Sequence, residues 1–154
     1  MVLVVDAAAE QPPVLPIHRL VRDPVVPGPA TDVVTGLTDL VATIRDEDRT
    51  YGLIRRRGRR LEHRVGALRG RPPTVRALHE EVLGDLPPGM RFVPDAVAAE
   101  SSVRTGAAGA AYVLPPTRVE RIRAVIAEGG TLPVKSTYFW PKPRTGMVIR
   151  PFDP

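Results

Sequence analysis

Short strand-like and helix-like segments alternate along this chain of 154 residues, and the alternation restricts the fold more than any other feature. The strand-like segments are apolar and rich in β-branched residues, whereas the helix-like segments carry apolar residues at every third or fourth position. Proline and glycine, at 18 and 13 residues, predict many turns between them. The alternation predicts an α+β protein with α/β-like layers, in which about four helices pack on a mixed sheet.

The strand-like segments are expected at residues 2–5, 14–21, 50–54, 61–68, 90–93, 110–114 and 147–150. The first of them has no polar residue, as is typical of a strand covered on both faces. Pro16 lacks a backbone N–H group, so it restricts its segment to a sheet edge or to a strand start. Gly58, within the arginine-rich run 55–60, predicts a β-hairpin with an arginine-rich tip.

Four segments have helical spacing and are expected to begin near residues 31, 74, 95 and 117. Side-chain oxygens that can cap a helix stand at three of these places, on Thr31 or Asp32, Asp95 and Thr117. The first helix is expected to end at the acidic residues 46–48, which we interpret as an exposed end. The other three helices are expected to end at glycines: Gly84, Gly106 and Gly129.

Length and composition favour one domain covering residues 1–154. The chain has no cysteine, which excludes disulfides and thiolate metal sites. No apolar run approaches the roughly 20 residues that span a bilayer, and the first residues lack the pattern of a secretory signal. We therefore expect a cytoplasmic protein with no membrane partner. Because the chain begins within a strand-like segment, we also expect it to be part of a longer protein.

The formal charge of +5 favours anionic partners, such as nucleotides and phosphorylated metabolites. Of the 22 basic residues only Lys135 and Lys142 are lysines, and both lie in the segment 133–146. Lysine carries a compact ammonium group on a flexible stem, whereas arginine carries a planar fork. This segment is therefore the first candidate for a functional surface.

Lys135 to Thr137 resemble the end of a P-loop, whose pattern is Gly-x-x-x-x-Gly-Lys-Ser/Thr between a strand and a helix. Gly129 fits the first glycine, but Val134 occupies the position of the second, so the chain fails the pattern. Two interpretations remain, a structural loop with solvated cations and a loop that binds a phosphate or carboxylate. The binding residues would be Lys135, Ser136, Thr137, Lys142, Arg144 and Thr145.

The aromatic residues Tyr138, Phe139 and Trp140 follow directly. They either stack against a planar ligand or form a strand in which Phe139 packs in the core. The three histidines have no spacing typical of a metal site, so no metal is expected. We call the segment 133–146 the lysine loop. His18 and Arg19, at a strand end, either line the same cleft as the lysine loop or only stabilise the fold.

The arginine run 55–60 is the largest cluster of positive charge and suggests nucleic acid as a partner. A solvated hairpin tip explains it without a partner, and no zinc-finger or helix-turn-helix pattern is present. Nucleic acid is therefore not an expected partner.

Two longer motifs are Gly109-Ala-Ala-Tyr-Val-Leu-Pro-Pro-Thr-Arg-Val-Glu and Lys135-Ser-Thr-Tyr-Phe-Trp-Pro-Lys. Together with Leu15-Pro-Ile-His-Arg and the helix-like segment from Thr74, they resemble the C-terminal half of the bacterial and archaeal family of unknown function numbered 1015. The likeness covers nearly the whole chain. Members of this family are longer, and their N-terminal half carries a Gly-His-His-Arg element similar to that of ParB-like free-serine kinases.

This chain has no Gly-His-His-Arg element. The resemblance thus implies a C-terminal half, or a shortened member, that works with the missing N-terminal half or with a homo-oligomer partner. For the complete protein it implies ATP or ADP with Mg²⁺ as cofactors.

The leading hypothesis is a module that binds a small anionic metabolite or nucleotide through the lysine loop, with His18 and Arg19 in the same cleft. The alternatives are a part of a free-serine kinase-like enzyme, not active alone, and a structural or interaction module without a ligand. The kinase would need a general base and a metal site, and neither is readable in the sequence.

Overall fold

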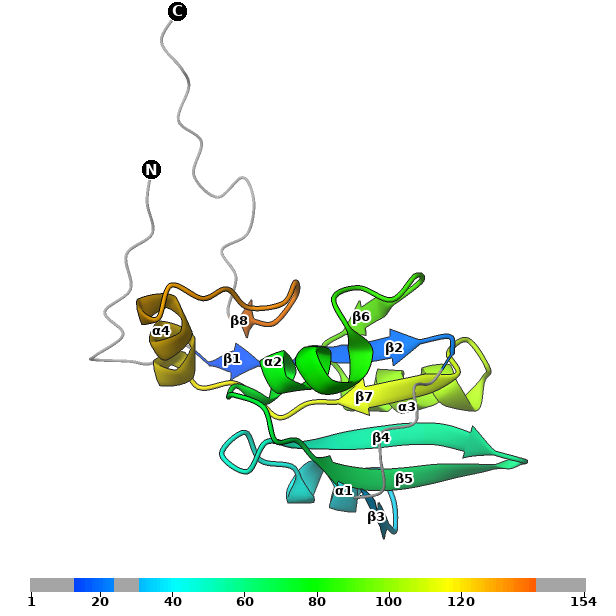
Figure 1. Cartoon of the computed structure of the whole chain (residues 1–154). Helices are drawn as coiled ribbons and strands as arrows, with labels where there is room; N and C mark the ends of the chain where they lie inside the picture. Colours follow the sequence, from blue (N-terminus) through cyan, green and yellow to red (C-terminus); the bar gives the residue numbers. More distant parts are fainter. Residues whose placement is uncertain (1–12, 24–30, 141–154) are drawn as a thin grey trace, which may run out of the picture.

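The computed structural model describes residues 13–23 and 31–140, and six of its strands form one sheet (Figure 1). Their spatial order is β3 (Thr31–Val34), β5 (Arg60–Ala67), β4 (Thr50–Arg57), β7 (Ala110–Val113), β2 (His18–Val21) and β6 (Arg91–Val93). A separate pair joins β1 (Val14–Leu15) to β8 (Tyr138–Phe139). The α+β class is confirmed. We expected a mixed sheet, and the strand pairs within the described residues are antiparallel.

Helices cover both faces of the sheet (Figure 1). One face packs against α1 (Leu37–Thr43) and α3 (Ala96–Arg104), and the other against α2 (Thr74–Leu78) and its π-helical continuation η1 (His79–Leu83). Helix α4 (Val119–Ala127) follows β7. Adjacent residues of a strand point to opposite faces, so Ile54 belongs to the core under α1 and α3, and Leu53 to the core under α2.

The hairpin is confirmed, and its strands extend further into the arginine run than expected. Arg57 pairs with Arg60, which leaves Gly58 and Arg59 as the turn. Gly58 has a φ of +61°, in the left-handed region that favours glycine. A glycine at the first position of a two-residue turn suits the twist of the two strands.

The first helix is shorter than predicted, and the prediction of Thr31 or Asp32 as its cap is wrong. Residues 31–34 form β3, which pairs with β5, and α1 begins only after Gly36. Thr117 is also not a cap, because Arg118 holds that position without a side-chain hydrogen bond. Asp95 does cap α3, since its carboxylate accepts a hydrogen bond from Val97 N at 2.8 Å.

Pro16 lies outside the ladder, as its missing N–H group requires, and separates β1 from β2. The expected strands 2–5 and 147–150 lie outside the described residues. Within the described residues, no helix has the length and apolar character needed to cross a membrane.

Candidate functional site

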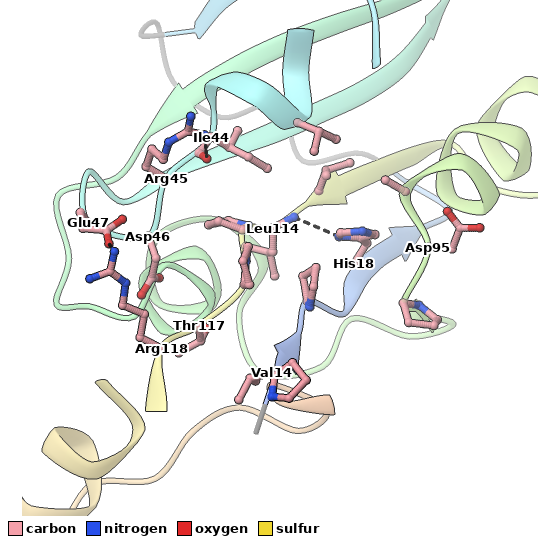
Figure 2. A pocket seen from close by; sticks show the side chains of 18 of the residues that line it. Val14, His18, Ile44, Arg45, Asp46, Glu47, Asp95, Leu114, Thr117 and Arg118 are labelled. Atoms are coloured by element: carbon pink, nitrogen blue, oxygen red, sulfur yellow. Dashed lines mark hydrogen bonds and ion pairs between the residues drawn. The ribbon is translucent and has the colours of Figure 1, made fainter. Parts of the chain in front are cut away.

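A cleft of about 730 Å³ opens where the start of β2, the end of β7 and the ends of three helices meet (Figure 2). Prolines form much of its wall: Pro13, Pro16, Pro94, Pro115 and Pro116. The polar side chains among its lining residues are His18, Arg45, Asp46, Glu47, Asp95, Thr117 and Arg118. A mostly apolar concave site with a few polar groups is the usual form of a small-molecule site.

His18 is a buried, neutral histidine at one side of this cleft. Its residue surface is 3% exposed, and its Nδ1 accepts a hydrogen bond from Leu114 N at 3.1 Å. Burial and the charge of Arg19 lower the pKa of His18 from 6.5 to about 4, against the opposing effect of Asp95. Because Nδ1 is an acceptor, the single proton of the neutral ring lies on Nε2.

The Nε2–H group of His18 opens to the cleft. The hydrogen bond to Leu114 N is the one recorded for this ring. Every side-chain nitrogen or oxygen that is fully buried within residues 13–23 and 31–140 has a partner, so Nε2 is not among the sealed atoms. His18 lines the cleft and therefore offers it a hydrogen-bond donor.

Asp46 and Thr117 lie on the side of the cleft away from His18 (Figure 2). Asp46 is only 4% exposed, which contradicts our interpretation of residues 46–48 as an exposed end. Its Oδ1 accepts a hydrogen bond from Thr74 N at 2.7 Å, and no bond is recorded for Oδ2. By the same reasoning as for His18, Oδ2 of Asp46 and the buried hydroxyl of Thr117 open to the cleft.

Arg19 lies on the opposite face of the sheet from His18. It is fully buried, and its guanidinium lies 5.4 Å from the centre of the Phe92 ring. Its Nε donates to His79 Nε2 at 3.3 Å, and its two terminal nitrogens donate to Ile17 O and, at 3.1 Å, to Val134 O. Burial lowers the pKa of Arg19 to about 10, so it stays charged at neutral pH.

His79 has the tautomer opposite to that of His18. Its Nδ1 lies 2.7 Å from Gly84 O and 3.1 Å from Asp85 O, so Nδ1 carries the proton and Nε2 accepts from Arg19. Burial is the main cause that lowers the pKa of His79 and keeps it neutral. His79 therefore acts as a fixed acceptor that holds the Arg19 side chain in place.

The lysine loop meets Arg19 but does not line the cleft of His18. Lys135 is exposed and has a φ of +54°, Ser136 is buried with its hydroxyl donating to Pro133 O, and Thr137 is partly buried. The prediction of one cleft shared by His18 and Arg19 is wrong, because neighbours in a strand face opposite sides. The remaining predicted residues Lys142, Arg144 and Thr145 lie outside the described residues.

The aromatic run forms a strand, but not the core strand that we expected for Phe139. Tyr138 and Phe139 make up β8, and Phe139 is 41% exposed. Trp140 is 51% exposed and stacks on Tyr138, with ring centres 6.2 Å apart. A two-stranded pair at the side of the molecule has only one covered face, which explains this exposure.

Sequence reasoning missed Asp46 and Thr117 as site residues. Both were assigned to helix ends, and no sequence pattern distinguishes a buried carboxylate from an exposed one there. Across the described residues, no group of three or more His, Cys, Asp or Glu side chains is arranged to hold a metal ion. No model of a protein family, no curated protein and no solved structure matches the chain.

Proposed function

We propose that this chain is a binding module for a small anionic molecule. An anionic oxygen of this molecule accepts a hydrogen bond from the Nε2–H group of His18. The observation that carries the proposal is a buried, neutral imidazole whose proton opens to a cleft of about 730 Å³. A buried donor without a protein partner is stabilised when a ligand supplies an acceptor. The apolar proline wall favours a ligand with a short hydrocarbon body.

Two features favour an anionic over a neutral acceptor. Arg19 affects the pKa of His18 more strongly than Asp95 does, so these two neighbours together give a positive field at the ring. The chain also carries a formal charge of +5, which raises the local concentration of anions.

Nuclear magnetic resonance of the His18 ring tests this proposal, with hexanoate and inorganic phosphate as probes. A bound anion stabilises the protonated ring, so we expect the pKa of His18 to rise above its value of about 4. His18→Asn keeps an acceptor for Leu114 N but removes the donor at Nε2, and should weaken hexanoate binding about tenfold. His18→Gln has a longer side chain and should retain more of the affinity for hexanoate than His18→Asn does.

Arg57→Ala, on the exposed hairpin tip, is the control and should bind like the unaltered chain. Equal affinity of His18→Asn and the unaltered chain would contradict the proposal. His18 ring signals that stay unchanged at high concentrations of hexanoate and of phosphate would contradict it as well.

Phosphate binding by the lysine loop is a second candidate function. The loop borders another hollow of about 600 Å³, lined by Arg76, His79 and residues 129–134 among others. Arg19 fixes Val134, the residue before Lys135, so the exposed ammonium starts from an anchored backbone. An ammonium beside backbone and hydroxyl groups is a common phosphate contact.

Thermal unfolding with phosphate, ATP, ADP and phosphoserine tests the lysine loop. A ligand at about ten times its Kd stabilises by about 1.4 kcal/mol, which raises Tm by about 3–5 °C. The shift should disappear in Lys135→Ala and persist in Arg57→Ala. If no ligand shifts the unaltered chain, the loop is not a phosphate site.

The family assignment remains our proposal, and it rests on the Lys135-Ser-Thr-Tyr-Phe-Trp-Pro-Lys element. In a complete protein of that family, the kinase-like alternative would use ATP or ADP with Mg²⁺ and groups supplied by an N-terminal half.

A further inference from the structure

The side of the cleft away from His18 holds a buried carboxylate with no recorded counter-ion. The carboxylate of Asp46 has one hydrogen bond, from Thr74 N to Oδ1, and none of the ion pairs found within the described residues includes it. A buried carboxylate is strongly disfavoured unless a positive group or several hydrogen bonds compensate it. The open Oδ2 atom is therefore a place for a cation.

Two arginines on the cleft wall are engaged elsewhere. Nη1 of Arg45 donates to Ile44 O at 2.8 Å, and Nη2 of Arg118 forms an ion pair with Glu47 at 2.7 Å. Neither arginine neutralises Asp46 in this arrangement. The first N–H group of α2 compensates Oδ1 of Asp46 in part, and a ligand can supply a cation to the open Oδ2 atom.

Thr117 supplies a second acceptor in the same part of the cleft. Its residue is buried and its hydroxyl has no recorded protein partner, so the oxygen can accept a hydrogen bond from a ligand. A ligand ammonium group has three donors in a compact volume, so it can bond to the Asp46 carboxylate and the Thr117 oxygen at the same time. A ligand hydroxyl has one donor and can bond to only one of them.

We propose that the cleft binds a molecule with an ammonium group on Asp46 and Thr117 and an acidic oxygen on His18. The inference rests on the proposed function and adds the second group of its ligand. His18 and Asp46 lie on opposite sides of the cleft (Figure 2), so we infer a ligand whose two groups stand at opposite ends of its carbon chain. On this inference an α-amino acid, whose two groups share one carbon, is a poorer ligand.

Calorimetric titration of the full chain with four probes tests this assignment: 6-aminohexanoate, hexanoate, hexylamine and glycine. We expect 6-aminohexanoate to bind at least about tenfold tighter than hexanoate, because it adds a charged hydrogen bond. Asp46→Asn should remove that advantage and hexylamine binding while leaving hexanoate binding undiminished. Thr117→Val should reduce the advantage in part, and glycine should not bind.

Asp46→Asn keeps the Oδ1 acceptor for Thr74 N, and the amide spectrum of each variant checks that its fold is intact. If hexanoate binds through His18 but Asp46→Asn leaves 6-aminohexanoate binding unchanged, the ammonium site is overturned and the proposed function stands. If hexanoate fails to bind the unaltered chain and phosphate leaves the His18 ring signals unchanged, the proposed function falls. In that case hexylamine binding that depends on Asp46 supports the ammonium site, and its absence overturns that too.

Discussion

Arg19→Met is expected to destabilise the fold by about 3–5 kcal/mol and to release the lysine loop. The guanidinium donates to Ile17 O, His79 Nε2 and Val134 O, which belong to three separate parts of the chain. Methionine fills much of the same volume but donates to none of them. Each buried acceptor left without a donor contributes about 1–3 kcal/mol of destabilisation. Urea denaturation at pH 7.5 measures the change.

Hydrogen exchange separates a local effect on the loop from a general loss of stability. Amides in residues 131–137 should exchange faster in Arg19→Met at urea-free conditions, because Val134 loses its anchor. Arg19→Lys keeps the charge but not the planar fork, so its stability should lie between those of the unaltered chain and Arg19→Met. Arg57→Met, at an exposed site, is the matched control and should change stability by no more than about 0.5 kcal/mol.

A free energy of unfolding for Arg19→Met within about 0.5 kcal/mol of the unaltered chain would refute this account of Arg19. If amide exchange in residues 131–137 is unchanged in Arg19→Met, contacts other than the one from Arg19 anchor Val134.

Local signals in the sequence sufficed where an element is defined by its own residues. Gly58 fixes the hairpin turn, because its positive φ is a conformation that glycine adopts without strain. Asp95 fixes the start of α3, because its side chain bonds to a backbone N–H two residues later. Neither prediction needs knowledge of distant parts of the chain.

Tertiary pairing decided the element that the sequence mispredicted. Val33, Leu37 and Leu40 follow a helical spacing, so the pattern continues across the boundary between β3 and α1. Residues 31–34 form a strand because β5 offers them an edge to pair with. Strand preference depends on such partners more than helix preference does.

The site was predictable only in part for the same reason. Alternation along a strand already implies that His18 and Arg19 diverge, although their adjacency in sequence suggested a shared cleft. Asp46 lies in the loop after α1 and Thr117 just before α4, and they face one cleft only because these two helix ends converge. No spacing along the chain encodes that convergence.

The second large effect is a loss of stability in mild acid that depends on His18. In the unfolded chain its pKa is about 6.5, and in the folded protein it is about 4. As the pH falls from 6.5 towards 4, the unfolded state binds a proton that the folded state does not, so stability falls with pH. Above about pH 7.5 both states are neutral at this site, and it adds no pH dependence. The pKa of His79 is lowered in the same direction, and it adds to the effect.

Urea denaturation at pH 7.5, 6.5, 5.5 and 4.5 should show the contribution of His18 as about 2.5 kcal/mol lost over this range. His18→Asn has no titrating group at this position and should lose that much of the pH dependence, while any remaining slope includes His79. The range ends at pH 4.5 because the pKa values of Glu62 and Glu100 are lowered, so their contributions are lost below it. Parallel profiles of the two proteins would mean that His18 is not held neutral by burial, and the donor at Nε2 would lose its basis.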